Sequence, residues 1–139
     1  MRIIAVDENS LHKLHIVEIR QSEELRSHVL VLRDKHRRSL EIPIGHCEST
    51  AIQMGLDQQP AERPQTHDLL LTLATRLQAT VERVVIDDFS ADTFYARLIL
   101  SSADGTTSLD CRPSDGIALA IRADAPIFAS DAVMTAGNR

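Results

Sequence analysis

Residues 109–115, with the sequence LDCRPSD, gather side chains that could act on a phosphate ester. Asp110 and Arg112 alternate along a predicted strand and would share one face, about 7 Å apart. Ser114 and Asp115 begin the helix that is predicted to follow. Carboxylates can hold a divalent metal ion that activates water, and an arginine can neutralise charge that develops on phosphate. The same residues could instead form an ordinary ion pair and a helix cap, so both interpretations stay open.

A second polar segment, RPQTHD at 63–68, leads into another predicted helix. The N–H groups and the dipole at a helix start favour an anion, and Arg63, Thr66 and His67 lie within a few residues of this start. The segment is therefore a candidate phosphate site. Alternatively, Thr66 is only an N-cap, Asp68 only complements the dipole, and His67 is merely exposed.

Glu48 is a third acidic residue at a predicted helix start, where the dipole favours a carboxylate in any case. If a divalent ion such as Mg²⁺ or Mn²⁺ binds, its candidate ligands are Glu48, Asp110 and Asp115. The run RDKHRR at 33–38 is the one basic concentration in the sequence. It is more typical of a solvated hairpin tip than of a nucleic-acid contact, although it could touch nucleic acid.

These residues must be positioned by strands and helices, which the hydrophobic pattern predicts in turn. Apolar and β-branched runs, some of them with period two, predict strands at 14–20, 28–32, 40–44, 81–86, 93–100, 108–112 and 127–129. Apolar residues at helical spacing predict helices at 45–56, 66–77 and 113–121. In the second helix they form one apolar face, whereas the third is apolar all round and is expected to be buried. The order predicts an α+β fold, a largely antiparallel or mixed sheet with about three helices.

Two segments, 14–56 and 81–121, share the order strand, strand, strand, helix. SLE at 39–41 resembles SLD at 108–110, and Glu48 takes the place of Asp115 when the two helices are matched. The two matches differ in register by two residues. We therefore predict an internal duplication, with the helix that starts at Thr66 between the two copies.

The composition is that of one globular domain, predicted to span 1–139 with its core at about 14–134. The chain has 139 residues, of which 43% are hydrophobic and 25% charged. The apolar run at 1–6 is too short for a signal peptide, and no stretch approaches about 20 apolar residues, which predicts a cytoplasmic protein without membrane contact. Cys47 and Cys111 lack the paired spacing of a zinc or redox site and are expected in or near the core.

The charge of the chain argues against general affinity for nucleic acid. The net charge is −5, the aromatic content is 3%, and Lys13 and Lys35 are the only lysines. Motifs of phosphate-binding loops, dinucleotide sites, zinc proteases and serine hydrolases are absent from the sequence. Any contact with a phosphate backbone must therefore come from a local patch or from a bound metal.

Five motifs together resemble the bifunctional nuclease family, or BFN domain: IGHCE at 44–48, RPQTHDLL at 63–70, TFYA at 93–96, DCRPSD at 110–115 and APIF at 125–128. The resemblance runs from about Leu14 to Met134. It implies a small α+β domain that hydrolyses DNA and RNA and associates into homo-oligomers, with a dimer favoured. Gly116 departs from the family's usual alanine and Pro43 from a common tryptophan. The glycine either weakens its helix by up to about 1 kcal/mol or permits a closer backbone contact.

Two hypotheses follow for the function. The first is a nuclease that acts on DNA or RNA, with catalytic residues His67, Asp68, Asp110 and Asp115 and with Arg63, Thr66, Arg112 and Ser114 on the substrate. The second is a non-catalytic module of the same fold that binds a ligand or assembles into oligomers, which the acidic charge and scarce lysine favour. Geometry separates them in part, because the catalytic set requires His67, Asp110 and Asp115 on one side of the fold.

Overall fold

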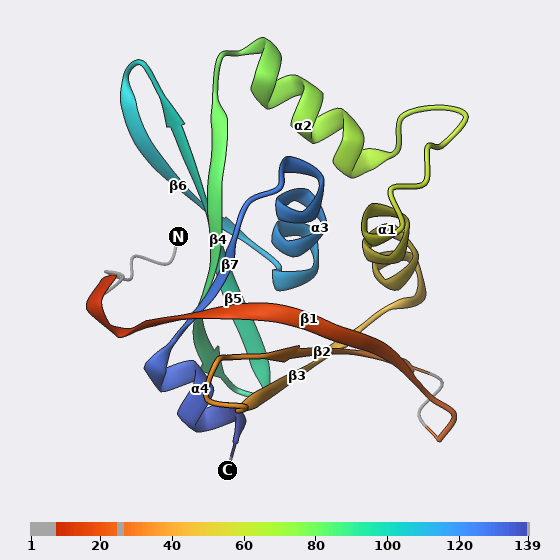
Figure 1. The fold of residues 1–139 in the computed structure, drawn as a ribbon, viewed down its shortest axis with the longest axis vertical. Helices are drawn as coiled ribbons and strands as arrows, with labels where there is room; N and C mark the ends of the chain where they lie inside the picture. The colour runs from red at the N-terminus through yellow and green to blue at the C-terminus, as the bar shows by residue number, and fades with distance from the viewer. Residues whose placement is uncertain (1–7, 25–26, 139) are drawn as a thin grey trace.

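The computed structural model describes residues 8–24 and 27–138, so the apolar run at 1–6 lies outside the described residues. Within them, seven strands form one sheet: β1 (Leu11–Ser22), β2 (Ser27–Arg33), β3 (Ser39–Ile44), β4 (Thr80–Ser90), β5 (Thr93–Ser102), β6 (Gly105–Cys111) and β7 (Ile127–Ser130). The described helices are α1 (His46–Leu56), α2 (Thr66–Arg76), α3 (Pro113–Ala123), α4 (Asp131–Gly137) and the short 3₁₀ turn η1 (Glu8–Ser10). Figure 1 shows their arrangement.

The sheet has the order β3-β2-β1-β7-β4-β5-β6. All neighbouring strands are antiparallel except β4 and β7, which are parallel. The predicted α+β fold with a mixed sheet is therefore confirmed. Two three-stranded units flank β7 in mirrored order, and each ends in a helix, α1 or α3. This arrangement is the one that the predicted duplication requires.

The hairpin of β4 and β5 is longer than the sequence indicates. The strands predicted at 81–86 and 93–100 leave residues 87–92 for the turn, but the turn is only Ala91 and Asp92, both with positive φ, which suits a two-residue hairpin. Asp87 instead sits at a bulge in β4, where its carboxylate Oδ2 lies 3.3 Å from the Nε of Arg97. This buried ion pair lets a charged residue lie inside a strand.

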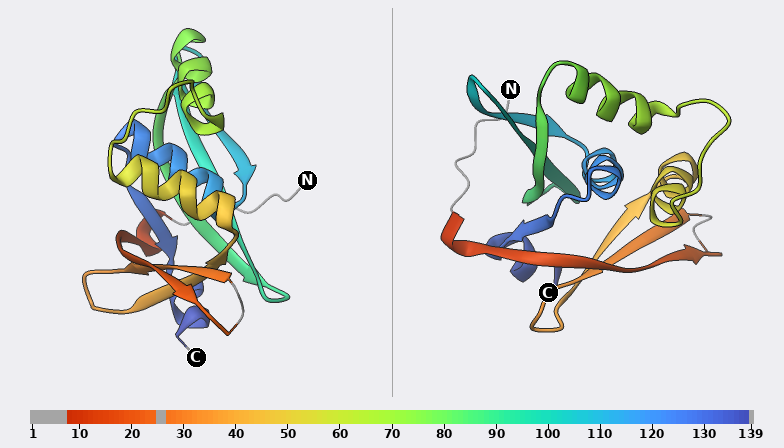
Figure 2. Two further views of the ribbon diagram at one scale, coloured as in Figure 1. Left: turned by 90° about the vertical axis from the view of Figure 1, so that its right-hand side faces the viewer. Right: turned by 45° about the horizontal axis from the view of Figure 1, so that its top comes forward.

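The hydrophobic core lies between the sheet and the helices α1 and α3, which pack side by side (Figure 2). Its members include Leu30, Leu32, Ile52 and Ile117, each with no more than 8% of its surface exposed. The prediction that α3 is buried is confirmed, because its apolar stretch from Ile117 to Ala120 is enclosed. These two helices therefore have fixed positions on the sheet.

Gly116 allows α3 to lie close to the sheet. A Cβ atom at this position would lie 2.6 Å from the Cγ2 of Val84 and 3.1 Å from the Sγ of Cys111. The glycine thus permits the closer backbone contact that was one of the two alternatives for its departure from alanine. It also brings the first turn of α3, which carries Asp115, close to β4 and β6.

Two helices differ from expectation. α4 was not predicted; Ser130 is its N-cap, and the Ser130 hydroxyl accepts a hydrogen bond from the N–H of Val133 at 3.2 Å. α2 was predicted to have one apolar face, and that face is exposed. The exposed fractions are 61% for Leu69, 42% for Leu70, 53% for Leu73 and 70% for Leu77. Among the described residues no helix is long and apolar enough to cross a membrane.

Candidate active site at three helix starts

The first turns of α1, α2 and α3 meet at one corner of the molecule. Glu48 is the third residue of α1, His67 the second residue of α2 and Asp115 the third residue of α3. Arg112 is the N-cap of α3 and joins them. We call these four residues the helix-start cluster. Because each side chain comes from the start of a helix that packs on its neighbours, the backbone holds all four in place.

The contacts of the cluster form a continuous chain. The Nε2 of His67 lies 3.0 Å from the Oδ1 of Asp115. Arg112 donates from Nε to the Oδ2 of Asp115 at 3.0 Å and from Nη2 to its Oδ1 at 3.3 Å. Its Nη1 donates to the Oε1 of Glu48 at 3.2 Å. These bonds use three of the five N–H groups of the guanidinium, so two remain for another acceptor.

The four side chains of the helix-start cluster differ sharply in burial. The His67 side chain is 10% exposed and that of Asp115 35%, whereas the Arg112 side chain is 64% exposed. Glu48 is intermediate, with 24% of its side chain exposed. The imidazole of His67 is thus enclosed, whereas the guanidinium of Arg112 faces solvent. This arrangement suits a site with a proton-transfer group inside and an anion bound at the surface.

The electrostatics favour ionised carboxylates. Burial acts to raise the pKa of Asp115, but hydrogen bonds from Arg112 and His67 outweigh it and the pKa is lowered. The pKa of Glu48 is lowered, first by a hydrogen bond from its own backbone N–H and then by Arg112, against the effect of burial. The pKa of Arg112 is raised, chiefly by its hydrogen bond to Asp115. Two negative charges therefore flank one positive charge.

Gly45 leaves space for the carboxylate of Glu48, because it has no side chain. A Cβ atom on residue 45 would lie 2.3 Å from the Oε2 of Glu48, so any side chain there would push the carboxylate away. Gly45 is the N-cap of α1, as Arg112 is of α3. The equivalence of Glu48 and Asp115, predicted from the repeat, thus has a physical counterpart: both are third helix residues, and both bind one guanidinium.

A pocket of about 310 Å³ opens beside the cluster. Glu48, Arg112 and Ser114 line it together with residues of β3 and with the turn and start of β5. Ser114 itself is 7% exposed. The pocket therefore lies between the two halves of the predicted repeat, with the polar cluster at its wall. A small anion or one phosphate group of a larger molecule would meet Arg112 there.

The predicted residues of the second segment have other surroundings. Gln65, not Thr66, is the N-cap of α2; its N–H donates to the Oδ2 of Asp68 at 2.9 Å. The Oδ1 of Asp68 accepts from the Nε of Arg122 at 2.8 Å. The capping prediction for Thr66 was wrong by one residue. Asp68 serves the cap and this ion pair, while Arg63 and Thr66 lie exposed beside the helix start.

Asp110 does not join the helix-start cluster. It lies on β6 opposite Arg97 of β5, and its neighbour Cys111 points toward α3, so Asp110 points to the other face of the sheet. Arg112, expected on that same face, has left the strand to cap α3. The predicted sharing of a face was therefore wrong. In the part of the chain that the structure describes, no three His, Cys, Asp or Glu side chains are grouped to hold a metal ion.

Arg122 is the residue that sequence reasoning missed. Its side chain is 9% exposed, and besides Asp68 it binds the carbonyl oxygens of Ala51 and Ala118 at 3.0 Å each. It thereby ties α1, α2 and α3 together behind the cluster. A basic residue in the last turn of an apolar helix was the available signal. Cys47, expected in or near the core, is exposed, and Cys111 is half-buried.

Comparison with known proteins identifies relatives. The model of the bifunctional nuclease domain matches residues 30–138. An uncharacterized protein of Mycobacterium tuberculosis is 38% identical over 125 residues, which cover 88% of this chain and 73% of the relative. Bifunctional nuclease 1 of Oryza sativa subsp. japonica is 29% identical over 114 residues, which cover 78% of this chain and 34% of the rice protein. The helix-start cluster lies wholly within the matched residues.

Proposed function

The chain belongs to the bifunctional nuclease domain family, and from this premise we propose that it hydrolyses phosphodiester bonds of DNA and RNA at the helix-start cluster. The observation that carries the proposal is the enclosed His67–Asp115 pair, with Nε2 and Oδ1 3.0 Å apart, next to an arginine that is 64% exposed. A carboxylate on one ring nitrogen orients a histidine and supports proton transfer at the other. An exposed arginine with two unused N–H groups suits a phosphate oxygen.

In the proposed reaction, water attacks phosphorus and one P–O ester bond breaks. His67 takes a proton from the attacking water through Nδ1, while Asp115 holds Nε2. The leaving oxygen takes a proton from solvent water and His67 afterwards returns its own proton to solvent, while Arg112 neutralises the charge that develops on the phosphate. Glu48 holds Arg112 in place from the side opposite Asp115. Asp68 acts as a positioning residue, because it holds the start of α2 through Gln65 and Arg122.

Involvement of Mg²⁺ or Mn²⁺ is part of this proposal. Glu48 and Asp115 are the carboxylates at the corner, so they are the residues that would supply oxygen ligands there. Asp110, the third candidate ligand in the sequence, points to the other face of the sheet. A metal ion would compete with Arg112 for both carboxylates, and activity measured with Mg²⁺, Mn²⁺ or EDTA distinguishes a required ion from an inhibitory one.

The proposal is tested on purified protein with labelled single-stranded DNA and RNA. We expect His67→Ala and Arg112→Gln each to lower cleavage by about 10²- to 10⁴-fold, because each removes a group proposed to act in the transition state. His28→Gln, which changes an imidazole outside the cluster, is the matched control and should cleave at the unchanged rate. Full activity in a His67→Ala/Asp115→Ala double variant would mean that the cleavage comes from elsewhere.

We also propose a homodimer, formed through the exposed leucine face of α2. Leu69, Leu70, Leu73 and Leu77 fall within about 100° of one another around the helix axis, so they form one stripe. Exposed fractions of 42% to 70% are unusual for four leucines on one helix of a monomer. A second copy of the chain offers an identical stripe, and a two-fold axis would bury both at once. Dimerisation and catalysis are compatible, since the stripe does not include the helix-start cluster.

A further inference from the structure

A second pocket lies where β1 extends past the end of β2. Residues 11–14 of β1 pair with β7, while the pairing with β2 begins only at His15 and Arg33. The pocket in this place has a volume of about 630 Å³, and Lys13, Lys35, His12, His15, His36 and Phe128 are among its lining residues. We call it the lysine–histidine pocket. It shares no lining residue with the pocket beside the helix-start cluster.

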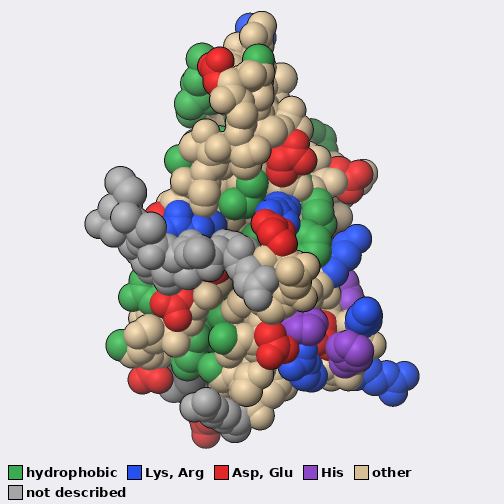
Figure 3. Space-filling model, turned by 90° about the vertical axis from the view of Figure 1, so that its left-hand side faces the viewer, with side chains coloured by type: hydrophobic (Ala, Val, Ile, Leu, Met, Phe, Trp, Pro, Cys, Tyr) green, Lys and Arg blue, Asp and Glu red, His purple; other side chains and the backbone are tan. Residues whose placement is uncertain are grey.

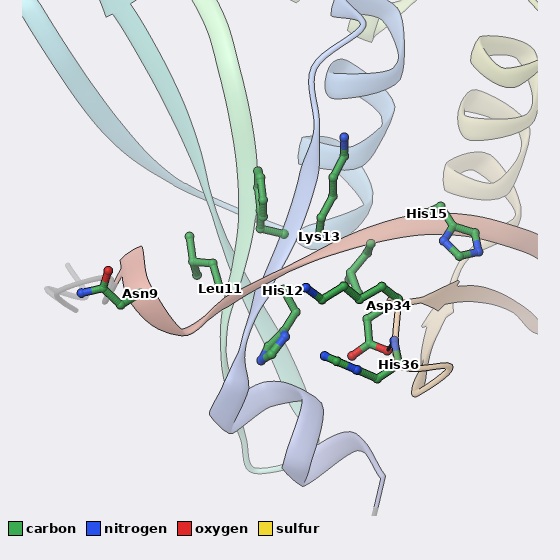
Figure 4. Close-up of a pocket in the computed structure, with 10 residues that line it drawn as sticks. Asn9, Leu11, His12, Lys13, His15, Asp34 and His36 are labelled. Atoms are coloured by element: carbon green, nitrogen blue, oxygen red, sulfur yellow. Dashed lines mark hydrogen bonds between the residues drawn. The ribbon is translucent and has the colours of Figure 1, made fainter.

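The pocket concentrates cationic and imidazole side chains of an acidic chain. The net charge is −5, yet both lysines and three of the six histidines line this one pocket. His12, Lys13 and His15 come from β1, and Asp34 and His36 from the turn after β2 (Figure 4). Figure 3 shows histidine and Lys or Arg side chains gathered on one part of one face of the molecule, with Asp or Glu side chains among them. The net charge of the whole chain therefore does not describe the surface around this pocket, where Lys and His side chains gather.

The acidic residues nearby are already paired. The Oδ2 of Asp34 accepts from the Nε of Arg38 at 2.9 Å, and the Nη1 of Arg38 lies 3.6 Å from the Oδ1 of Asp131. That same Oδ1 lies 2.9 Å from the Nε2 of His12. Within residues 8–24 and 27–138, neither Lys13 nor Lys35 makes an ion pair. Their ammonium groups are the charges left for a ligand.

The cationic turn is also held in one conformation before any ligand binds. The Oδ1 of Asp34 accepts hydrogen bonds from the backbone N–H groups of His36 and Arg38, both at 2.9 Å. Arg37 adopts a positive φ of 66°, which closes the turn. Lys35 and His36 are thus presented from a fixed backbone, and ligand binding need not order the loop.

We infer that the lysine–histidine pocket binds the phosphate backbone of single-stranded nucleic acid, an inference that rests on the proposed nuclease function. Lysines on two separate elements, β1 and the turn after β2, can contact more than one phosphate of a strand. Phe128 and the imidazole rings add flat surfaces on which bases can stack. The pocket holds a long substrate at a place distinct from the cleavage site, so it affects affinity for polymers and not the chemical step.

The test measures binding of a labelled single-stranded oligonucleotide by fluorescence anisotropy, with EDTA present so that cleavage requiring a metal ion is suppressed. In Lys13→Ala/Lys35→Ala we expect affinity to fall about tenfold or more at about 50 mM salt, and the salt slope to decrease by about 1.4. Lys13→Arg/Lys35→Arg should keep the affinity of the unchanged protein. Arg20→Ala/Arg76→Ala removes the same charge elsewhere and should change the affinity by less than about twofold.

Two further measurements separate this inference from the proposed catalysis. Hydrolysis of bis(p-nitrophenyl) phosphate, which has no polymer backbone, should be unchanged in the lysine variant. The unchanged protein could cleave no substrate while Lys13→Ala/Lys35→Ala still loses oligonucleotide binding. In that case the nuclease proposal fails, and the pocket is still supported as a binding site. Equal losses of oligonucleotide affinity in Lys13→Ala/Lys35→Ala and Arg20→Ala/Arg76→Ala would overturn the inference. So would thermal stabilisation of the protein by inorganic phosphate without any binding of the oligonucleotide.

Discussion

Asp34 shows how one buried carboxylate can organise a basic turn. Its side chain is 1% exposed and accepts three hydrogen bonds, from the N–H groups of His36 and Arg38 and from the Nε of Arg38. Burial by itself acts to raise the pKa of Asp34, but these hydrogen bonds outweigh it and the pKa is lowered. The ionised carboxylate is therefore a structural component of the turn that carries Lys35.

We predict that Asp34→Asn lowers the free energy of unfolding by about 1–3 kcal/mol at neutral pH, because an amide cannot accept all three hydrogen bonds. The pKa of Asp34 is lowered in the folded state, so its stabilising contribution is present above the unfolded value of about 3.9 and is lost as pH falls through the folded value. Urea unfolding should thus show a difference between the two proteins that is large above about pH 5 and smaller at about pH 3.

The matched control is Asp104→Asn, which changes an exposed carboxylate in the turn between β5 and β6. It should unfold like the unchanged protein at both pH values. A difference between Asp34→Asn and the unchanged protein that stayed constant down to pH values of about 3 would contradict the assigned role of the charge.

At the scale of elements, close packing of α3 on β4 depends on Gly116. Alanine would improve the helix propensity by up to about 1 kcal/mol, but its Cβ would lie 2.6 Å from the Cγ2 of Val84. Overpacking of this kind costs about 1–3 kcal/mol. We therefore predict a net destabilisation in Gly116→Ala, measured by urea or thermal unfolding.

A double-mutant cycle checks the cause. In a Val84→Ala background the clashing methyl group is gone, so Gly116→Ala should cost less than it does in the unchanged protein. Equal costs in the two backgrounds would show that Val84 is not the obstacle. The unfolding measurements also report on the helix-start cluster, since Asp115 precedes Gly116 and moves with the start of α3.

Local patterns predicted the elements well where one physical rule dominates. Period-two alternation located β3, and apolar residues on all sides indicated the burial of α3. The extent of β4 was missed because Asp87 resembles a turn residue until Arg97 is known to lie beside it. α4 is a short helix of 7 residues, and only its Ser130 cap gave a local signal.

The candidate site was predicted in part, for a reason of geometry. The helix starts at 63–68 and 110–115 were both recognised as polar, and His67 and Asp115 do meet. The bond from Arg112 to Glu48 spans 64 positions in sequence, and only the packing of α1 against α3 creates it. Asp110 was included because a strand face was extended to Arg112, one residue past the end of β6.

At the scale of the whole molecule, charge and apolar surface are distributed unevenly. The helix-start cluster, the lysine–histidine pocket and the leucine stripe of α2 have no residue in common. A net charge of −5 opposes nucleic-acid binding only as an average, because the two lysines lie in one pocket. Likewise, an apolar helical face in sequence does not tell whether the core or a second chain covers it.

The leucine stripe makes a prediction about assembly that is independent of catalysis. Leu69→Glu/Leu73→Glu places two charges on the exposed face of α2, where a homodimer would have to bury them at a cost of several kcal/mol. Because both leucines are more than half exposed, the monomer fold should tolerate the change. Light scattering after size-exclusion chromatography should find a dimer for the unchanged protein and a monomer for this variant.

Val17→Glu, an exposed apolar position on β1, should remain dimeric. A monomer at every concentration in the unchanged protein would rule out the proposed dimer, and a dimer that survives both leucine substitutions would assign the interface to another surface.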